Sequence, residues 1–375
     1  MNETFLKHKF LFLPLLLATF IFSLDKLFGL TCIRKYTESR IEYAFYAEKK
    51  DLLEQLLNFQ KNQKPEEKLL VLFGTSHMGE FSHKYIHEKN EKITTYNFSA
   101  PMAPPSYLYY NLQTVLDAGA KIDYAVLEII PETFQAAANE YALKFSYDWK
   151  FMYENKDIFS EQEIESFIHA NLFSVVRFPP RLNIAMQRIK DKNAIAGFEY
   201  FNSMVKLATK QNNGGIPNPI IHEIPEDFFE KESKVYFAQA FRKSGNLSYS
   251  ESKTQKAFYE RFIETCKKNN IQLLIYKPIL SKPLQKLLDE SDFYETWWKD
   301  KVEIANQKGI TVLDMAEYST SIQCQKFVDV HHLSGGCYPE ITDILLEKIL
   351  PQMNGSTHST GSGESSSPQR TDEHR

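Results

Sequence analysis

The stretch "LLVLFGTSHMGEF" (residues 69–81) decides the fold. Residues 69–73 form an unbroken apolar run, which is typical of a strand buried on both faces of a sheet. The chain then becomes polar at Gly-Thr-Ser-His, residues 74–77, before a helical pattern follows. A serine at a strand-to-helix turn is either a helix-capping residue or a nucleophile. The rest of the sequence has to separate these two interpretations.

Similar short apolar runs recur along the chain and alternate with helical patterns. We expect strands at residues 69–73, 92–98, 124–130, 271–276 and 310–313, and helices at residues 78–88, 104–117, 252–268, 284–308 and 339–350. This alternation predicts an α/β fold with a parallel central sheet covered by helices on both faces. Because such sheets bind ligands at the carboxyl ends of their strands, we expect Ser76 at a ligand-binding edge.

Composition and rhythm divide the rest of the chain. The 375 residues are 43% hydrophobic and 25% charged, as in a folded globular protein. The net charge of −4 supplies no basic field, so we predict no nucleic-acid partner. A globular domain is expected at residues 67–350, with a mostly helical, proline-containing insertion at about 133–249. Residues 351–375 are rich in Ser, Gly and charge and are predicted to be disordered.

The N-terminal region predicts a membrane anchor. Residues 1–9 carry basic side chains and are expected in the cytoplasm. Residues 10–30 are predicted to be an uncleaved signal anchor that forms a transmembrane helix, with Asp25 and Lys26 at the lipid boundary. A cleaved signal peptide is the alternative, but no small-x-small site follows the run. Residues 31–66, with an amphipathic helix at 36–64, are expected to form a helical stalk that packs on the globular domain, with the bulk of the chain outside the cytoplasmic membrane.

Several residues could in principle form a metal site, a disulfide or a charged binding surface. His83 and His87 have a metal-ligand spacing on a helix, but their neighbours indicate a solvated face, and we predict no metal ion. Cys324 and Cys337 can form a disulfide in an oxidising compartment, although isolated buried thiols are the favoured interpretation. We interpret four basic residues of the insertion as scattered surface charges: Arg177, Arg181, Arg188 and Lys190.

A serine nucleophile needs a base and an orienting carboxylate. The stretch "FVDVHHLSGGCYPEIT" (residues 327–342) offers both, because Asp329 and His332 are three residues apart after the last strand. This spacing lets Asp329 hold one imidazole nitrogen of His332 while the other nitrogen faces Ser76. We therefore predict His332 as the base, with its neighbour His331 turned aside.

These two stretches resemble a known superfamily. Gly74-Thr75-Ser76 resembles the first block of the SGNH (GDSL-type) hydrolases, and residues 329–334 resemble their last block, Asp-x-x-His-Leu-Ser. The anchor and the insertion look closest to an envelope-facing branch that includes alginate and peptidoglycan O-acetyltransferase domains and the teichoic-acid D-alanyl transfer protein. The resemblance covers roughly residues 68–132 and 250–350 and implies a flavodoxin-like three-layer sandwich, an acyl-enzyme on Ser76, and ester hydrolysis or acyl transfer.

The middle blocks of that superfamily, which supply oxyanion donors, have no clear match in this sequence. We expect the backbone N–H of Ser76 to be one donor, with Ser99, Ala100 or Asn97 as candidates for the second. Four further residues are expected at or near the pocket: Thr75, His77, Glu128 and His331.

We therefore expect a membrane-anchored SGNH-like serine acyltransferase or esterase that acts on cell-envelope acyl esters, with O-acyl transfer to a glycan preferred. The chemistry needs no cofactor. The expected partners are a glycan or another acyl acceptor, and the resemblance implies a membrane protein that delivers the acyl donor. One alternative is a weak or inactive SGNH-fold subunit that binds glycan or assists assembly. The other is a metal-dependent hydrolase that uses His83 and His87.

Overall fold

A five-stranded, all-parallel sheet lies at the centre of the computed structural model, which describes residues 3–38, 42–47, 49–243 and 246–355. The strands are β1 (Lys68–Phe73), β2 (Ile93–Asn97), β3 (Tyr124–Glu128), β6 (Gln272–Lys277) and β7 (Thr311–Asp314). The predicted α/β class and parallel sheet are confirmed, and each predicted strand end lies within two residues of the observed one. Strand β3 is buried along its whole length because helices cover both of its faces.

The strand order β2-β1-β3-β6-β7 contains a reversal of direction. The chain leaves β1 toward one edge to form β2, and then returns past β1 to form β3, β6 and β7. The carboxyl ends of β1 and β3 therefore border the switch point, where doubly wound sheets bind their ligands. In the register of this pair Phe73 lies opposite Leu127, so the turn after β1 meets the end of β3 at Glu128.

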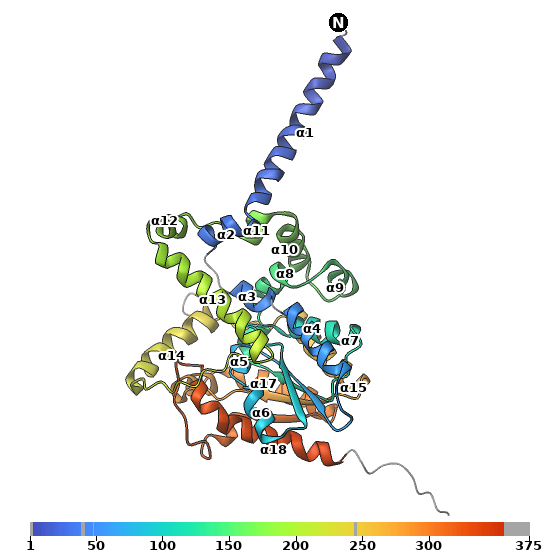
Figure 1. Cartoon of the computed structure of the whole chain (residues 1–375). Helices are drawn as coiled ribbons and strands as arrows, with labels where there is room; N and C mark the ends of the chain where they lie inside the picture. Colours follow the sequence, from blue (N-terminus) through green and yellow to red (C-terminus); the bar gives the residue numbers. More distant parts are fainter. Residues whose placement is uncertain (1–2, 39–41, 48, 244–245, 356–375) are drawn as a thin grey trace, which may run out of the picture.

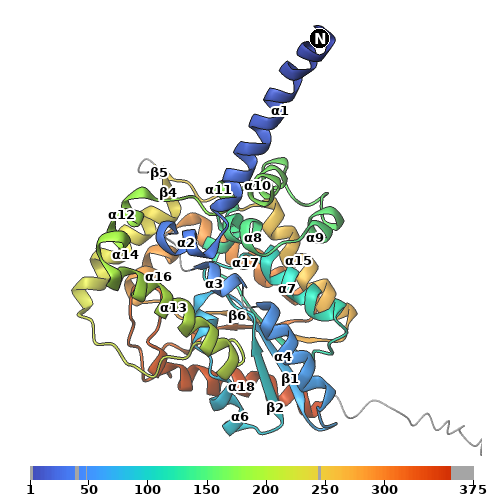
Figure 2. The same ribbon diagram turned by 45° about the horizontal axis from the view of Figure 1, so that its top comes forward.

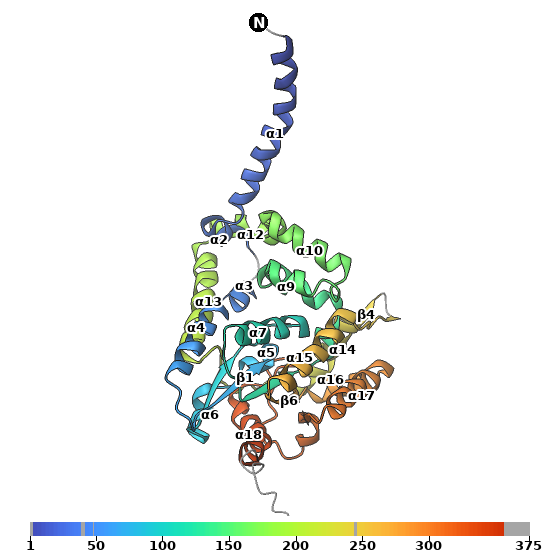
Figure 3. The same cartoon turned by 90° about the vertical axis from the view of Figure 1, so that its right-hand side faces the viewer.

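Helices cover the sheet on two sides (Figures 1 and 3). Helices α6 (His83–Lys89) and α18 (Tyr338–Gly355) pack together on one face, whereas α7 (Pro105–Asp117), α15 (Lys253–Lys268) and α17 (Asp292–Gln307) lie on the other. Each of the second set turns an apolar stripe inward, as Phe258 and Phe262 of α15 show. This arrangement is compatible with a three-layer sandwich.

The expected insertion is mostly helical. It runs from η1 (Pro131–Phe134) to a short hairpin of β4 (Arg242–Lys243) and β5 (Asn246–Leu247). Between them lie η2 (Ala136–Asn139), α8 (Glu140–Phe145), α9 (Trp149–Glu154), α10 (Glu161–Leu172), α11 (Ser174–Arg177), α12 (Leu182–Lys190), α13 (Lys192–Gln211) and α14 (Glu226–Phe241). After α13 an extended segment, residues 212–222, crosses the carboxyl edge of the sheet, and we call it the strap.

Residues 31–66 form part of the body and not one long stalk helix. They fold as α2 (Thr31–Thr37), α3 (Glu42–Ala47) and α4 (Lys49–Lys61). Helix α4 buries Leu52 and Leu56 completely, and Tyr46 of α3 joins the same hydrophobic core. The predicted amphipathic stripe exists and packs onto the sheet domain, because this is the nearest apolar surface that can cover it.

Helix α1 (Glu3–Leu27) projects away from the body (Figures 1 and 2). Among the described residues, no single helix combines the length and apolar character that crossing a membrane requires. The segments Phe12–Leu27 and Thr31–Thr37 meet those criteria only as a pair, which is bent by 70°. The predicted span of residues 10–30 is therefore not one continuous helix, since the chain turns at residues 28–30 around Gly29.

Other helix boundaries differ from prediction in instructive places. The helix expected at 78–88 is divided into α5 (Ser76–Gly79) and α6, and the one expected at 284–308 into α16 (Lys282–Asp289) and α17. Helix α18 continues to Gly355, so residues 351–355 of the predicted disordered tail are helical. The remainder of that tail, residues 356–375, lies outside the described residues.

Candidate active site

The turn after β1 brings Ser76 to the carboxyl edge of the sheet. Gly74 begins this turn, and a Cβ added there would lie 2.7 Å from the Cβ of Glu128, so a larger residue would force the two strand ends apart. Thr75 is the N-cap of α5, and Ser76 is its first residue. The side chain of Thr75 makes no capping hydrogen bond, and Ser76 remains partly exposed.

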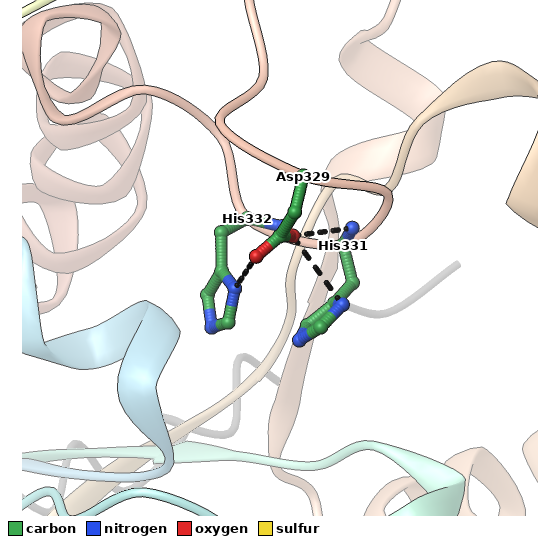
Figure 4. Close-up of side chains that lie close together, drawn as sticks. All are labelled: Asp329, His331 and His332. Carbon is green, nitrogen blue, oxygen red and sulfur yellow. Dashed lines mark hydrogen bonds and ion pairs between the residues drawn. The ribbon is translucent and has the colours of Figure 1, made fainter. Parts of the chain in front are cut away.

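Ser76, His332 and Asp329 form a continuous hydrogen-bonded chain. The Oγ of Ser76 lies 2.6 Å from Nε2 of His332, and Nδ1 of His332 lies 2.8 Å from Oδ2 of Asp329. The other oxygen of Asp329 accepts the backbone N–H groups of His332 (2.7 Å) and His331 (3.0 Å), as Figure 4 shows for this loop. The carboxylate therefore keeps the proton on Nδ1 and leaves Nε2 free to accept the proton of Ser76. The predicted proximity of the two distant segments is present in the structure.

The charges in the loop favour His332 as the base. Burial raises the pKa of Asp329, but the hydrogen bond and charge of His332 outweigh it and hold this pKa well below its ordinary value. Burial and the neighbouring His332 lower the pKa of His331 to about 3, so its ring is neutral. The ring of His331 stacks on Tyr236 with 4.7 Å between centroids, whereas the ring of His332 makes the hydrogen bond to Ser76. Asp329 thus stays ionised next to His332.

A second, buried network lies behind the nucleophile. Glu128 accepts the backbone N–H of Thr75 and its hydroxyl, both at 2.7 Å. The same carboxylate lies 2.7 Å from Nδ1 of His77, whose Nε2 donates to the carbonyl oxygen of His331 at 2.9 Å. The four expected pocket residues are therefore gathered beside the triad. Only Thr75 among them lines the cavity in front of Ser76.

The His77 side chain joins the two loops that carry the triad. Burial lowers the pKa of His77, but the charge and hydrogen bond of Glu128 outweigh it and raise this pKa above its ordinary value. A protonated imidazole donates from both nitrogens, which matches a carboxylate on one side and a carbonyl on the other. His77 directly follows Ser76, and His331 directly precedes His332, so this buried ion pair fixes one loop against the other.

A cavity of about 180 Å³ opens in front of Ser76. Its apolar wall comes from Phe45 of α3, Met204 of α13 and Ile216 of the strap. The strap is held by its backbone, since the N–H of Ile216 donates to the carbonyl of Gly79 at 2.6 Å. Farther along, the N–H of His222 donates to Oγ of Ser334 at 3.1 Å, next to the loop that carries Asp329 and His332. The insertion therefore contributes a wall of the site.

The predicted second oxyanion donors need correction. The backbone N–H of Ser99 donates to Oδ1 of Asn97 at 3.0 Å, and that of Ala100 donates to the carbonyl of Gly74 at 3.1 Å. The side-chain amide of Asn97 donates to the carbonyl of Met78 at 2.6 Å and does not line the cavity. These groups stabilise the strand ends instead. The Ser99 hydroxyl faces the cavity without a hydrogen-bond partner among the described residues.

Glu80 lines the same cavity and was not predicted. Burial raises its pKa to about 7, although the backbone N–H of Asn218 donates to its Oε2 at 2.8 Å. The sequence places Glu80 on a polar helix end next to Ser82 and His83, which suggests exposure. Only the arrival of the strap, 138 residues later, covers it.

His83 and His87 have no third metal ligand close to them in the described part of the chain. Nδ1 of His83 accepts the backbone N–H of Thr95 at 3.3 Å, and Nδ1 of His87 lies 3.2 Å from the carbonyl of Ile93. The described residues contain one group whose ligand atoms lie within 4.8 Å of one another, formed by Asp329, His331 and His332. Two of its three members already belong to the hydrogen-bonded chain of Ser76.

Two predictions about side chains of the domain are wrong. Cys324 and Cys337 form a disulfide, 13 residues apart in sequence, and are not isolated thiols. The catalytic loop with Asp329 and His332 lies between them. Arg188 is not a surface charge, because its guanidinium is buried and donates to the carbonyls of Lys35 and Glu38 at 2.9 and 2.6 Å.

A family model described as a protein of unknown function, DUF1574, matches residues 5–349. The chain belongs to the DUF1574 family. The match covers α1, the sheet and the insertion, so both segments that meet at Ser76 lie inside it. A search of curated proteins found no match to this DUF1574 protein.

Proposed function

We propose that this DUF1574 protein is an SGNH-like serine acyltransferase or esterase of the cell envelope. The observation that carries the proposal is the pair of hydrogen bonds from Ser76 through His332 to Asp329, at 2.6 and 2.8 Å. The 2-1-3-4-5 order of the parallel strands supports a flavodoxin-like, SGNH-like fold, because the site lies at its switch point.

In the proposed reaction, Nε2 of His332 takes the hydroxyl proton while Oγ of Ser76 attacks the carbonyl carbon of an acyl ester. The tetrahedral intermediate expels the alkoxide, which receives the proton from His332, and the acyl group remains on Ser76. An acceptor hydroxyl then loses its proton to His332 and attacks the carbonyl carbon of the acyl-enzyme. The second tetrahedral intermediate expels Oγ of Ser76, which takes that proton from His332, and the acyl group leaves on the acceptor. Asp329 stabilises the imidazolium in both half-reactions. No cofactor takes part in these steps.

Two groups are proposed as oxyanion donors. The backbone N–H of Ser76 belongs to the first turn of α5 and has no partner within that helix. The hydroxyl of Ser99 lines the same cavity and replaces the backbone and amide donors that the fold engages elsewhere. Loss of one oxyanion donor costs about 10²–10³ in rate, so Ser99→Ala should slow acylation on that scale.

The substrate class follows from the cavity and the position of the chain. A cavity of about 180 Å³ has room for a short acyl group next to Ser76. A glycan hydroxyl is the preferred acceptor, and a membrane protein is the proposed source of the donor. We place the body outside the cytoplasmic membrane, anchored by α1, and the Cys324–Cys337 disulfide supports an oxidising compartment.

Labelling with a fluorophosphonate probe tests the proposed nucleophile. The native chain should become labelled on Ser76, Ser76→Ala should remain unlabelled, and His332→Ala should react about 10²–10⁴ times more slowly. Ser321→Ala is the matched control, since Ser321 lies on the exposed surface and should not affect labelling. Undiminished labelling of Ser76→Ala would remove the proposed nucleophile.

A non-catalytic subunit that binds envelope glycan is the second candidate. It is favoured by one observation, namely that the N–H groups of Ser99 and Ala100 are both used inside the protein. If this candidate is right, neither the native chain nor Ser99→Ala should react with the probe or turn over a short-chain aryl ester, whereas glycan binding should persist in Ser76→Ala.

A further inference from the structure

Helix α12 exposes its apolar side chains and buries a charged one, whereas the surface helix of a soluble protein does the opposite. Its apolar residues Leu182, Met186 and Ile189 recur at positions i, i+4 and i+7 and are 75%, 58% and 70% exposed. Its Arg188 is only 8% exposed and binds two carbonyls at the end of α2. A helix that buries its arginine and presents its apolar face outward is suited to an apolar surrounding, not to water.

This exposed stripe does not stand alone. Helices α2, α10, α11 and α12 gather at the end of the body from which α1 projects (Figures 1 and 3). The neighbouring segment adds more exposed apolar side chains: Leu172, Phe173, Val175 and Val176. Together with the stripe of α12 they form one apolar face around the base of α1, which we call the basal face. Arg181 and Lys190, which are exposed, flank the stripe at the two ends of α12.

Helix α1 is fixed to the basal face. The carboxylate of Asp25 is buried and accepts the backbone N–H groups of Ser174 and Val175 at 2.7 and 2.9 Å. One turn earlier, Phe22 makes an edge contact with Phe173 at 6.5 Å between ring centroids. The exposed apolar surface of α1 therefore continues onto α11 without a linker. If α1 enters the lipid, residues 172–176 must lie at the same level as its end.

We propose that the basal face lies in the headgroup region of the lipid bilayer, with the apolar stripe of α12 turned toward the acyl chains. The proposal rests on the anchoring of α1 but not on catalysis. The occupant is lipid because the face is continuous with the apolar surface of α1, and because Arg181 and Lys190 stand where phosphate headgroups would meet them. The body is thus docked on the membrane in one orientation.

This docking sets the height of Ser76 above the bilayer. Helix α13 begins directly after α12 and reaches the cavity at Met204. Twelve residues of helix rise about 18 Å, and α13 runs obliquely (Figure 1), so the cavity wall at Met204 lies at most about 18 Å below the start of α13. A substrate presented by a membrane-embedded donor can meet the site there without dissociation of the body from the lipid.

Depth-dependent quenching tests the proposal on the full-length chain. In a Cys32→Ser background the remaining cysteines are the buried Cys266 and the paired Cys324 and Cys337, so one new cysteine can be labelled with an environment-sensitive fluorophore. The labelled sites are Leu17→Cys, Met186→Cys, Gln187→Cys and Glu347→Cys, in nanodiscs of phosphatidylglycerol and phosphatidylethanolamine. With brominated acyl chains, the probe at Met186→Cys should be quenched at least fivefold more than that at Glu347→Cys on α18. Gln187→Cys, on the polar side of the same helix, should fall between them.

The outcomes separate the basal face from the anchor. If Leu17→Cys is quenched but Met186→Cys matches Glu347→Cys, the basal face does not touch lipid and the proposal is overturned while the anchor stands. If neither Leu17→Cys nor Met186→Cys is quenched, both are overturned. Cross-linking between the Met186→Cys residues of two chains, without quenching, would show that a second copy covers the stripe of α12. This outcome would also overturn the proposal. Probe labelling of Ser76 reports separately on the proposed catalysis.

Discussion

At the residue scale, the buried pair of His77 and Glu128 explains how two loops 254 residues apart hold one geometry. Glu128 accepts two hydrogen bonds from Thr75, and its partner His77 donates a hydrogen bond to the carbonyl oxygen of His331. Neither residue touches the cavity in front of Ser76, so both act as positioning residues. A buried ion pair is costly to break, because the remaining partner stays buried without compensation.

We predict that His77→Gln lowers the free energy of unfolding by about 3 kcal/mol and slows probe labelling of Ser76. The raised pKa of His77 sets the pH dependence, since its stabilising effect is complete below about 6.5 and is lost as the pH rises through the raised pKa. The difference in free energy of unfolding between native and variant should therefore shrink as the pH rises above 6.5. Denaturant unfolding at several pH values measures it, with His87→Gln on the outer face of α6 as control. A difference below 1 kcal/mol at pH 6 would contradict the positioning role.

For Glu80 we predict that a substitution stabilises the protein, in contrast to the substitution of His77. The pKa of Glu80 is raised from 4.5 to about 7, so the folded state binds more protons than the unfolded state between these values. The contribution of the protonated Glu80 side chain to the free energy of unfolding is thus complete below pH 4.5 and is lost as the pH rises through about 7. The variant Glu80→Gln keeps an acceptor for the N–H of Asn218 and removes the charge. At pH 8 its free energy of unfolding should exceed that of the native protein by about 3 kcal/mol, whereas at pH 4.5 the two should differ little. Thermal unfolding measures this, and the exposed Glu88→Gln should show no such divergence.

At the element scale, the strap depends on one glycine. Gly214 has φ +92°, and an added Cβ would overlap the carbonyl oxygen of Asn97. We predict that Gly214→Ala displaces the strap from β2, widens the cavity and reduces probe labelling about tenfold, with a loss of about 2 kcal/mol or more in stability. Gly119→Ala is the matched control, because Gly119 has φ +85° and nothing within 4 Å of an added Cβ. Equal effects of the two substitutions would show that backbone strain, and not the strap contact, is responsible.

The elements also show what a sequence can and cannot predict. The five strands were found within two residues because each is a short apolar run, and burial on both faces leaves no polar alternative. The proximity of Ser76 and His332 followed from placing both at the carboxyl edge of one parallel sheet. The strap was not predictable, since its attachments at Asn213, Ile216 and Asn218 use backbone atoms that carry no residue pattern. The strap contact at Asn218 also covers Glu80, whereas the N–H groups of Ser99 and Ala100 are engaged by Asn97 and Gly74 at the ends of the neighbouring strands.

At the scale of the whole molecule, part of the cavity wall comes from helices that neighbour the basal face in the chain. Two of its walls, Phe45 of α3 and Met204 of α13, belong to helices that lead from α2 and α12 to the sheet. The basic residues Lys7 and Lys9 near the start of α1 favour a cytoplasmic N-terminus, and the disulfide between Cys324 and Cys337 favours an oxidising environment for the body. Both observations support the same orientation across the membrane.

This orientation predicts the outcome of a protease experiment on cells. Protease added to right-side-out spheroplasts should digest the body, because the proposal places it outside the cytoplasmic membrane, whereas inverted vesicles should protect it. The two thiols of Cys324 and Cys337 should resist alkylation until reduced, while Cys32, which is exposed, should react without reduction. A body that is protected in spheroplasts, with four thiols reactive after denaturation alone, would place it in the cytoplasm and contradict an envelope substrate. The measurement needs no knowledge of the acyl group, since it depends only on which side of the bilayer the catalytic loop folds.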